Sequence, residues 1–250
     1  MTAAPETWLV LGASSAIARA FARAAAQDGA DILLAGRDRA DLDMTAADIA
    51  IRTGRRVHVM DFDAADLAGH AALIEAAREA AAGGTLNLFL AFGLMPNQSD
   101  IDRDPALALR AITVNYAGAV NLLQIAAPIL EAQRRGRIVA LGSVAGDRGR
   151  LKNYVYGSAK AGLSVYLQGL RARLHRAGVT VTTIKPGFVD TAMTFGLPGL
   201  FLVASPESVA RACLKAAKAG REELYVPFFW WGIMAIIRNI PERIFKRLNI

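Results

Sequence analysis

Short apolar runs alternate with long alanine-rich amphipathic segments along almost the whole chain. Periodicity and composition predict strands at residues 8–11, 31–35, 57–60, 86–91, 137–141, 179–184 and 223–226. They predict helices at residues 16–27, 65–82, 104–133, 155–177 and 206–219. Apolar strands that are separated by helices belong in a parallel sheet with helices packed on each side. The sequence therefore predicts an α/β fold with a doubly wound parallel sheet.

The composition is that of a globular protein. The chain has 250 residues, of which 54% are hydrophobic and 20% are charged. No internal repeat, linker or low-complexity block interrupts the sequence, so one domain over residues 1–250 is expected. The single cysteine, Cys213, excludes an internal disulfide and a cysteine-based metal cage. The first residues show no basic start followed by an apolar segment, so we expect a cytoplasmic protein without a secretory signal.

The formal net charge of +7 favours an anionic partner, which could be nucleic acid, an anionic cofactor or an anionic membrane. The basic residues form no long run, and no predicted helix has the spacing that reads bases, so nucleic-acid binding is not expected. The longest apolar stretch near the end runs from Val226 to Ile237 and contains Pro227. It is shorter than the about 20 residues needed to cross a bilayer. No membrane-spanning segment is therefore predicted.

A loop directly after the first predicted strand is suited to binding phosphate. It reads Gly-Ala-Ser-Ser-Ala-Ile-Ala from Gly12. A strand that turns into a helix N-terminus offers free backbone N–H groups to a pyrophosphate, and Ser14 and Ser15 can donate to its oxygens. Loops of this kind usually carry later glycines, where this chain has Ala16 and Ala18. A capped strand–helix turn without a ligand is the alternative.

The end of the second predicted strand bears on the choice of nucleotide. An enzyme that prefers NAD usually has a carboxylate there, which binds the ribose 2′-hydroxyl. Here Gly36 leaves room and Arg37 can pair with a 2′-phosphate, which favours NADP(H) over NAD(H). A solvated Arg37 is the alternative. Asp61, at the end of the third strand, is placed to meet an adenine edge or to cap a helix that begins near Ala64.

Tyr156 and Lys160 are four residues apart on a predicted helix and so lie on one face. An ammonium beside a phenol favours the ionised phenol, which would lower the tyrosine pKa toward neutrality. Ser143, thirteen residues earlier, follows a predicted strand and could hold a substrate oxygen against the phenol. This set predicts protonation of a carbonyl oxygen while hydride reaches the carbon.

Taken together, these motifs resemble the short-chain dehydrogenase/reductase family, a Rossmann-like fold, over essentially the whole chain. The resemblance implies that Tyr156 is the proton donor, that Lys160 lowers its pKa and holds the nicotinamide ribose, and that Ser143 orients the carbonyl. It implies that Asn115 anchors a water relay behind Lys160. Besides Gly12, Ser14, Ser15, Arg37 and Asp61, the cofactor contacts that it implies are Ile17, Gly93, Tyr156, Lys160, Pro186, Gly187, Val189 and Thr191.

The chain departs from the family pattern in two places, and both concern the cofactor. The phosphate loop lacks its second and third glycines. The usual Asn-Asn-Ala-Gly after the fourth strand reads Leu-Ala-Phe-Gly here, ending at Gly93. Neither change touches the reacting groups, so we expect an effect on cofactor affinity and preference only.

A narrower similarity is to the branch of decaprenylphosphoryl-2-keto-ribose reductases. It rests on Ala-Phe-Gly-Leu ending at Leu94, on the segments around Ser143 and Tyr156, and on the terminal residues 240–250. This similarity implies reduction of a 2-keto pentose on a polyprenyl phosphate, after a separate flavoprotein oxidase has acted on it. That branch is associated with NADH, which conflicts with the interpretation of Arg37. NADP(H) is kept as the first expectation.

The C-terminal segment, residues 227–250, is a possible membrane-interface tail. Residues 225–237 are rich in aromatic and apolar side chains, and they are followed by cations. Aromatic rings and flanking cations suit a bilayer interface, so peripheral membrane contact is expected. Packing on the sheet or an oligomer contact is the alternative. The predicted helices 104–133 and 155–177 resemble those through which the family forms dimers and tetramers, so a homo-oligomer is expected. The cations that follow the apolar residues are Arg238, Arg243, Lys246 and Arg247.

Other candidate residues receive a weaker interpretation. His58, His70 and His175 have no partner at metal-ligand spacing, so ordinary surface or capping histidines and no metal site are expected. Met193, Phe195 and Leu197 follow the Pro-Gly motif and are candidates for substrate contact. Three functions remain open: reduction of a lipid-linked keto sugar, reduction of a free hydrophobic ketone, and dinucleotide binding at a membrane surface without turnover.

Overall fold

The computed structural model describes residues 5–196 and 201–248. Seven parallel strands form one sheet in the order β3-β2-β1-β4-β5-β6-β7. The order reverses between β1 and β4, which lie next to each other in the middle of the sheet. The strands are β1 (Glu6–Leu11), β2 (Asp31–Gly36), β3 (Val57–Asp61), β4 (Thr85–Leu90), β5 (Arg137–Leu141), β6 (Thr180–Pro186) and β7 (Glu223–Val226).

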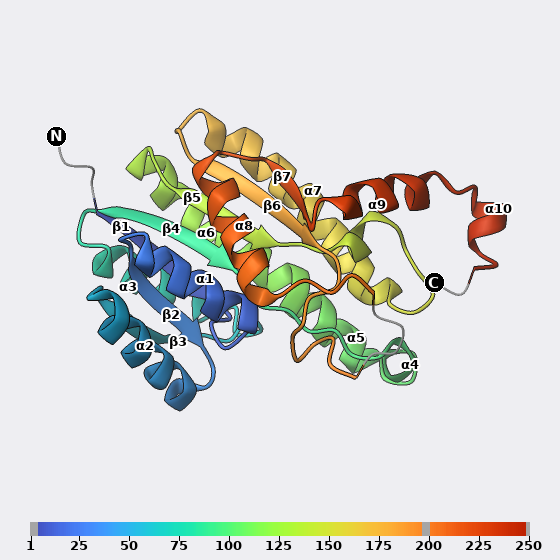
Figure 1. Cartoon of the computed structure of the whole chain (residues 1–250), viewed down its shortest axis with the longest axis horizontal. Helices are drawn as coiled ribbons and strands as arrows, with labels where there is room; N and C mark the ends of the chain where they lie inside the picture. Colours follow the sequence, from blue (N-terminus) through green and yellow to red (C-terminus); the bar gives the residue numbers. More distant parts are fainter. Residues whose placement is uncertain (1–4, 197–200, 249–250) are drawn as a thin grey trace.

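Helices cover both faces of the sheet, as Figure 1 shows. One hydrophobic cluster packs α1 (Ala16–Gln27), α2 (Arg39–Thr53) and α8 (Pro206–Lys218) on the first face. A second cluster packs α3 (His70–Ala80), α6 (Gly118–Gln133) and α7 (Tyr154–His175) on the opposite face. The central strands β2 and β4 are buried along their whole length. The predicted doubly wound fold is confirmed.

Helix α3 begins later than predicted, and α2 is one of the helices that the prediction did not contain. The predicted helix 65–82 begins only at His70, because two aspartates keep the preceding chain in turns. Asp63 Oδ1 accepts from the Ala65 N–H at 2.9 Å, and Asp66 Oδ1 accepts from the Gly69 N–H at 3.3 Å. Helix α2 was not predicted at all, since only four of its residues are buried and its apolar periodicity is weak. Those four residues are Leu42, Thr45, Ala46 and Ile49.

The predicted helix 104–133 is continuous but contains a wider turn. It consists of α5 (Pro105–Ile112), a π-helical turn η1 (Thr113–Ala117) and α6. Among the described residues this is the one helix long and apolar enough to cross a membrane. One face of α6 packs on the sheet in the second core cluster, which accounts for its apolar character. The π-helical turn carries Asn115.

The chain after β7 forms two further helices, α9 (Phe229–Asn239) and α10 (Glu242–Phe245). They extend beyond the sheet at one end of the molecule (Figure 1). Trp230 and Met234 of α9 are buried against Val144 and Tyr225. A short helix, α4 (Gln98–Ile101), precedes α5, and a 3₁₀ turn, η2 (Val144–Asp147), follows β5.

Because all seven strands are parallel, the chain leaves every strand at the same edge of the sheet. The loops after β1 and β4 therefore meet. At Gly12 a Cβ atom would lie 2.7 Å from the backbone nitrogen of Phe92, and the φ angle of Gly12 is +76°. Only glycine fits this close approach. In open α/β sheets, ligands bind at this point, where the strand order reverses.

Candidate active site

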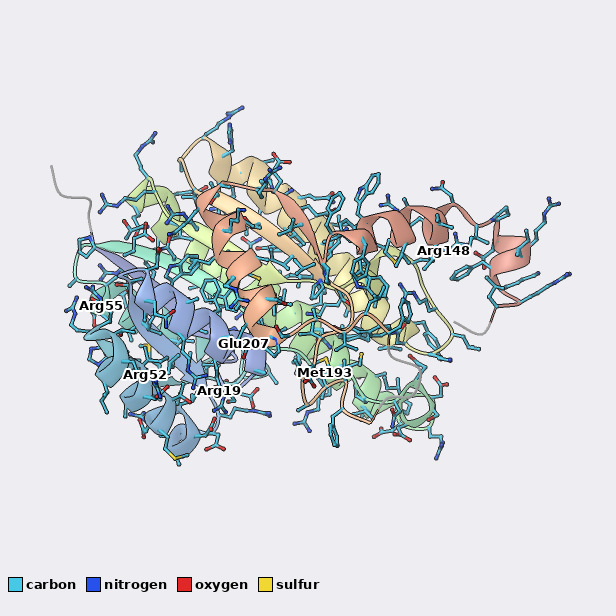
Figure 2. The ribbon with its side chains drawn as sticks, in the orientation of Figure 1. Arg19, Arg52, Arg55, Arg148, Met193 and Glu207 are labelled. Atoms are coloured by element: carbon cyan, nitrogen blue, oxygen red, sulfur yellow. The ribbon has the colours of Figure 1, made fainter. Side chains whose placement is uncertain are left out.

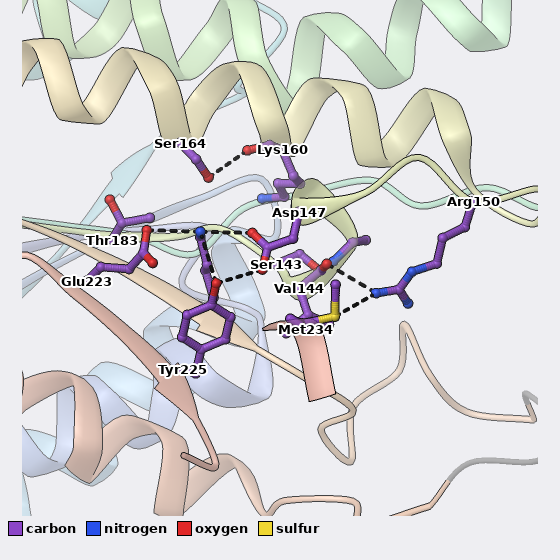
Figure 3. A network of polar contacts seen from close by, with 12 residues as sticks. Ser143, Val144, Asp147, Arg150, Lys160, Ser164, Thr183, Glu223, Tyr225 and Met234 are labelled. Carbon is purple, nitrogen blue, oxygen red and sulfur yellow. Dashed lines mark hydrogen bonds and ion pairs between the residues drawn. The ribbon is translucent and has the colours of Figure 1, made fainter. Parts of the chain in front are cut away.

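The predicted reacting residues come together beyond the carboxyl end of β5. Ser143 lies two residues after β5 and caps η2, where its Oγ accepts from the Ala145 N–H at 3.1 Å. Tyr156 and Lys160 lie in the first two turns of α7, which packs on η2. Figure 3 shows Ser143 at the turn that follows β5 and Lys160 on α7. The predicted grouping of these three side chains is thus present in the tertiary structure.

Tyr156 is buried, and the Ser143 hydroxyl lies beside its phenol. Burial raises the pKa of Tyr156 to about 12, and the neighbouring Ser143 hydroxyl opposes this rise. The expected lowering of this pKa by Lys160 is wrong for the protein by itself, because desolvation of the phenolate outweighs the other influences. Tyr156 therefore keeps its proton throughout the neutral range, which suits a proton donor.

Lys160 is fully enclosed, with 3% of its surface exposed. Its Nζ donates to the backbone oxygen of Leu141 at 2.8 Å and lies 5.8 Å from the centre of the Tyr156 ring. Burial lowers the pKa of Lys160 to about 8. The ammonium thus titrates close to the physiological range and points from α7 toward the end of β5.

Asn115 holds the chain that follows β4. Its Nδ2 donates to the backbone oxygens of Leu94 at 2.6 Å and of Ala111 at 2.8 Å, and its Oδ1 accepts from the Leu94 N–H at 3.1 Å. The π-helical turn carries Asn115, so its side chain joins α5 to the chain that follows β4. The water relay behind Lys160 stays a prediction.

Gly93 lies where four parts of the site converge. A Cβ atom there would be 3.0 Å from Asn115 Oδ1, 3.6 Å from Met193 Cε and 3.8 Å from Lys160 Nζ. The glycine therefore lets the chain after β4, the π-helical turn, α7 and the loop after β6 approach one another. The contact of Gly93 with the cofactor stays a prediction.

The phosphate loop is a strand-to-helix turn, as expected. One of its serines caps the helix, and the other is exposed and can reach a ligand. Ser15 caps α1, with its Oγ accepting from the Ala18 N–H at 3.2 Å, which leaves the hydroxyl hydrogen free. Ser14 is exposed. The side chains of Ile17 and Ala18 are buried in the first core cluster, so Ile17 can offer only its backbone to a cofactor. Alanine fits at position 18 because its methyl group packs in this core.

Arg19 stabilises the phosphate loop, and the sequence analysis did not identify it. Its Nε donates to the Ser14 carbonyl at 3.2 Å, and its guanidinium also reaches Thr45 and Asp41 of α2. Figure 2 labels it at the base of α1. An arginine in the first turn of the helix after such a loop could have predicted this role, because its side chain can reach back to the loop. Its bond to the loop carbonyl fixes the direction of the neighbouring N–H groups.

A cavity of about 320 Å³ lies at the ends of β2 and β3 and suits the adenosine part of a dinucleotide. Arg37 is exposed on its rim, and a Cβ atom on Gly36 would come within 3.4 Å of Ser14 Oγ. The cavity thus adjoins the phosphate loop, as a continuous cofactor site requires. Its lining residues are Gly36, Arg37, Asp61, Phe62, Asp63, Asp66, Gly69, His70 and Leu73.

Two interpretations at this cavity are corrected. Asp61 caps no helix, since α3 starts at His70, and its carboxylate instead lies 3.8 Å from the guanidinium of Arg39. His70 is a buried residue rather than a surface one, with 1% exposed. Asn121 Nδ2 lies 3.0 Å from its Nδ1, and its Nε2 lies 3.2 Å from the Asp63 carbonyl. The tautomer that accepts at Nδ1 and donates at Nε2 satisfies both contacts.

The chain after β6 closes the other side of the site. The Gly187 N–H donates to the Val226 carbonyl at 3.0 Å, and Val189 is buried and pairs with Ala204. Thr194 Oγ1 donates to the Val189 carbonyl at 2.5 Å and lies beside Thr191. Thr191 lies in this turn, beyond the buried Pro186, and the contact of both residues with the cofactor stays a prediction. Met193 and Phe195 are exposed, and Leu197 lies outside the described residues.

A buried ionic network lies next to the turn that follows Ser143, and the sequence did not predict it (Figure 3). Lys185 Nζ lies 2.8 Å from Asp147 Oδ1 and 2.9 Å from Glu223 Oε2, and the Tyr225 hydroxyl donates to Asp147 Oδ2 at 2.7 Å. The Lys185 and Asp147 side chains are 6% and 3% exposed. The network joins η2, β6 and β7. The sequence feature that could have predicted this network is Lys185, a charged residue inside an apolar strand, just before the Pro-Gly motif.

The fold and the site are those of an NAD(P)-dependent oxidoreductase, and comparison with known proteins defines the family. The chain matches the short chain dehydrogenase family over residues 6–197. It is 35% identical over 240 residues to an uncharacterized oxidoreductase of Mycobacterium tuberculosis, with 96% of each chain covered. The chain therefore belongs to the short-chain dehydrogenase/reductase family.

Further relatives and solved structures agree. A ketoacyl reductase of Nostoc is 28% identical over 227 residues, covering 88% of this chain and 78% of the relative. A short-chain dehydrogenase from Sphingobium yanoikuyae in complex with NADPH superposes with a TM-score of 0.81 at 26% identity, covering 95% of this chain and 97% of that chain. Another family member gives a TM-score of 0.79 at 30% identity, covering 90% and 97%.

Proposed function

We propose that this protein reduces a ketone to a secondary alcohol with NADPH as the reductant. The observation that carries the proposal is the Ser143 hydroxyl next to the buried Tyr156 phenol, with the buried Lys160 beside them. Ser143 and Tyr156 offer two hydroxyls to one carbonyl oxygen, and the Tyr156 pKa of about 12 keeps its proton in place until the oxygen takes on alkoxide character. Burial of Tyr156 and Lys160 keeps water away from the transfer.

The residues of the site fit a nicotinamide dinucleotide. Gly12 and the N-terminus of α1 would hold the pyrophosphate, with Ser14 and the free hydroxyl hydrogen of Ser15 as donors. When bound, the cofactor supplies the hydride. Lys160 would hold the nicotinamide ribose, and the chain from Pro186 to Thr191 would line the nicotinamide.

NADP(H) is proposed over NAD(H). Arg37 is exposed at the rim of the adenosine cavity, where a 2′-phosphate would lie, and Gly36 adds no bulk there. Asp38, the nearest carboxylate after β2, accepts from the Asp41 N–H as the cap of α2. The NADPH complex of the Sphingobium relative is consistent with this preference.

For the substrate, we propose a 2-keto pentose carried on a polyprenyl phosphate, supplied by a separate flavoprotein oxidase. Two observations support this: the sequence similarity to that branch of the family, and the exposed apolar side chains on the loop after β6 and on α9. The second candidate is a free hydrophobic ketone such as a ketoacyl chain, which the name of the Nostoc relative favours. We also propose that the protein is a cytoplasmic homo-oligomer that assembles through α6 and α7.

The deciding experiment is consumption of NADPH and of NADH, each measured with a polyprenylphosphoryl 2-keto pentose in detergent and with a panel of free ketones that includes a ketoacyl thioester. Turnover confined to the lipid-linked sugar supports the first candidate. Turnover only with free ketones replaces it by the second. A protein that binds NADPH and reduces none of these substrates would contradict the proposed activity.

A further inference from the structure

Helix α9 carries apolar side chains on its outer face as well as on its inner face. Trp230 and Met234 point into the molecule and are 2% and 0% exposed. On the opposite side, Phe228 just before the helix and Trp231 within it are 72% and 53% exposed, and Ile236 is 70% exposed. A helix that is apolar all round is normally covered on all sides. The outer face of α9 therefore needs an apolar partner.

The exposed apolar side chains continue onto the loop that leads into α8. Phe201 is 50% exposed, and its ring lies 5.6 Å from the Trp230 ring and 5.7 Å from the Phe188 ring. Leu202, next in the chain, is 58% exposed. The Phe228 and Trp231 rings are stacked 6.2 Å apart. We call these residues the apolar platform: Phe201, Leu202, Phe228, Phe229, Trp231 and Ile236.

The platform is held in place by Arg148 (Figure 2). Its Nη1 donates to the Arg238 carbonyl at 2.8 Å and to the Ile240 carbonyl at 2.9 Å, and its Nη2 lies 2.7 Å from Glu242 Oε2. The guanidinium also lies 4.1 Å from the centre of the Phe245 ring. These contacts fix the chain between α9 and α10 to the loop after η2, so the platform is presented on a rigid support.

The C-terminal part of the platform is flanked by positive charges. Residues 224–250 contain four basic residues and one acidic residue, Glu242, which is paired with Arg148. Among the described residues, none of the four basic side chains has an ion-pair partner, and all four are exposed. A second copy of this chain packed on the platform would bring these cations toward each other, which opposes association. The four cations are Arg238, Arg243, Lys246 and Arg247.

We propose that the apolar platform docks this protein on the surface of an anionic lipid bilayer. Aromatic side chains settle at the depth of the headgroups, and neighbouring arginines and lysines pair with lipid phosphates. Trp230 and Met234, on the inner face of α9, pack on Val144, the residue after Ser143. Docking therefore brings the catalytic edge of the sheet beside the bilayer, where a lipid-linked ketone would be found. The proposal rests on the platform and its charges, and it would explain access to the substrate proposed above.

The test is sedimentation of the purified full-length chain with vesicles of phosphatidylcholine, with and without phosphatidylglycerol. We expect binding to the anionic vesicles at least about tenfold above binding to the neutral ones, falling as salt is added. The double variant Phe228→Ser/Trp231→Ser should lose about tenfold in binding. The charge reversal Arg243→Glu/Lys246→Glu should lose a similar factor on anionic vesicles only.

Two controls separate docking from general effects. Ile51→Ser removes a side chain that is 85% exposed on α2, far along the sheet, and Arg176→Glu reverses an exposed charge after α7; both should bind vesicles like the parent. Failure of the parent to sediment with anionic vesicles would overturn the proposal. A platform variant that turns a dimer into a monomer in light scattering, with vesicle binding unchanged, would assign the surface to a second copy. Reduction of a soluble ketone, measured in parallel, reports on the catalytic proposal independently.

Discussion

The indole of Trp230 lies directly against Gly187: a Cβ atom at position 187 would be 1.9 Å from Trp230 Nε1. Gly187 follows β6 in the chain proposed to line the nicotinamide, and Trp230 belongs to α9 at the other end of the sequence. The C-terminal helix therefore packs directly on the segment that is proposed to line the nicotinamide. Trp230 Nε1 has no hydrogen-bond partner among the residues that the structure describes, so the contact is one of packing.

Gly187→Ala should destabilise the protein by about 1–3 kcal/mol, because the indole must move to admit the methyl group. Urea denaturation measures the change. In a Trp230→Leu background the same substitution should cost less than about 1 kcal/mol, since the smaller side chain frees the space. Equal costs in the two backgrounds would show that the contact is not the cause.

Tyr156→Phe should reduce turnover by about 10²–10⁴-fold, because the proton donor is removed, while NADPH binding measured by fluorescence is retained. Tyr154→Phe is the matched control. Tyr154 lies on the same helix, is 45% exposed and hydrogen-bonds to Asp102, so its loss should leave turnover unchanged. Activity of Tyr156→Phe comparable to the parent would contradict the proposed mechanism.

NADPH affinity should fall as the pH rises through about 8. Burial lowers the pKa of Lys160 to about 8. The side chain is therefore charged well below pH 8 and neutral well above it. The proposed contact with the cofactor ribose is lost with the charge. Dissociation constants between pH 6.5 and 9.5 test this. Lys160→Met should bind more weakly and with a flatter profile, and a slope identical to that of the parent would rule out Lys160 as the titrating group.

Arg37→Ala should weaken NADPH binding by about tenfold and leave NADH binding unchanged, since a charge-assisted contact to the 2′-phosphate is lost. Arg52→Ala is the control, because Arg52 lies in the last turn of α2 and pairs with Asp48 (Figure 2). Equal losses for NADPH and NADH would instead place Arg37 away from the 2′-phosphate.

Lys185→Met should destabilise the protein by about 3–5 kcal/mol, because it leaves the buried Asp147 carboxylate without its cation. The double variant Lys185→Met/Asp147→Asn should recover part of this loss, as the uncompensated charge is removed. Thermal unfolding of the four proteins forms a double-mutant cycle. Additive effects would show that the pair is not energetically coupled.

The sequence determined the fold class and the candidate reacting residues. Strands apolar on both faces can be buried only in a sheet covered on both sides, and the strands of this chain pair in that way. The spacing of Tyr156 and Lys160 is a property of the helix itself, so their shared face needed no tertiary information. Gly12 could be identified for the same reason, because a tight turn from a strand into a helix depends only on residues that are neighbours in the sequence.

Only the tertiary structure decided what depends on burial and on distant partners. The Tyr156 pKa is raised rather than lowered, because desolvation depends on all the surrounding elements and not on the neighbouring Lys160 alone. The ion pair of Lys185 with Asp147 joins residues 38 positions apart, and the contact of Trp230 with Gly187 joins residues 43 apart. Apolar periodicity predicts that a side chain is buried, but it does not predict which element packs on that side chain. For α9 the sequence showed an apolar segment, and the fold decided which side of it stays exposed.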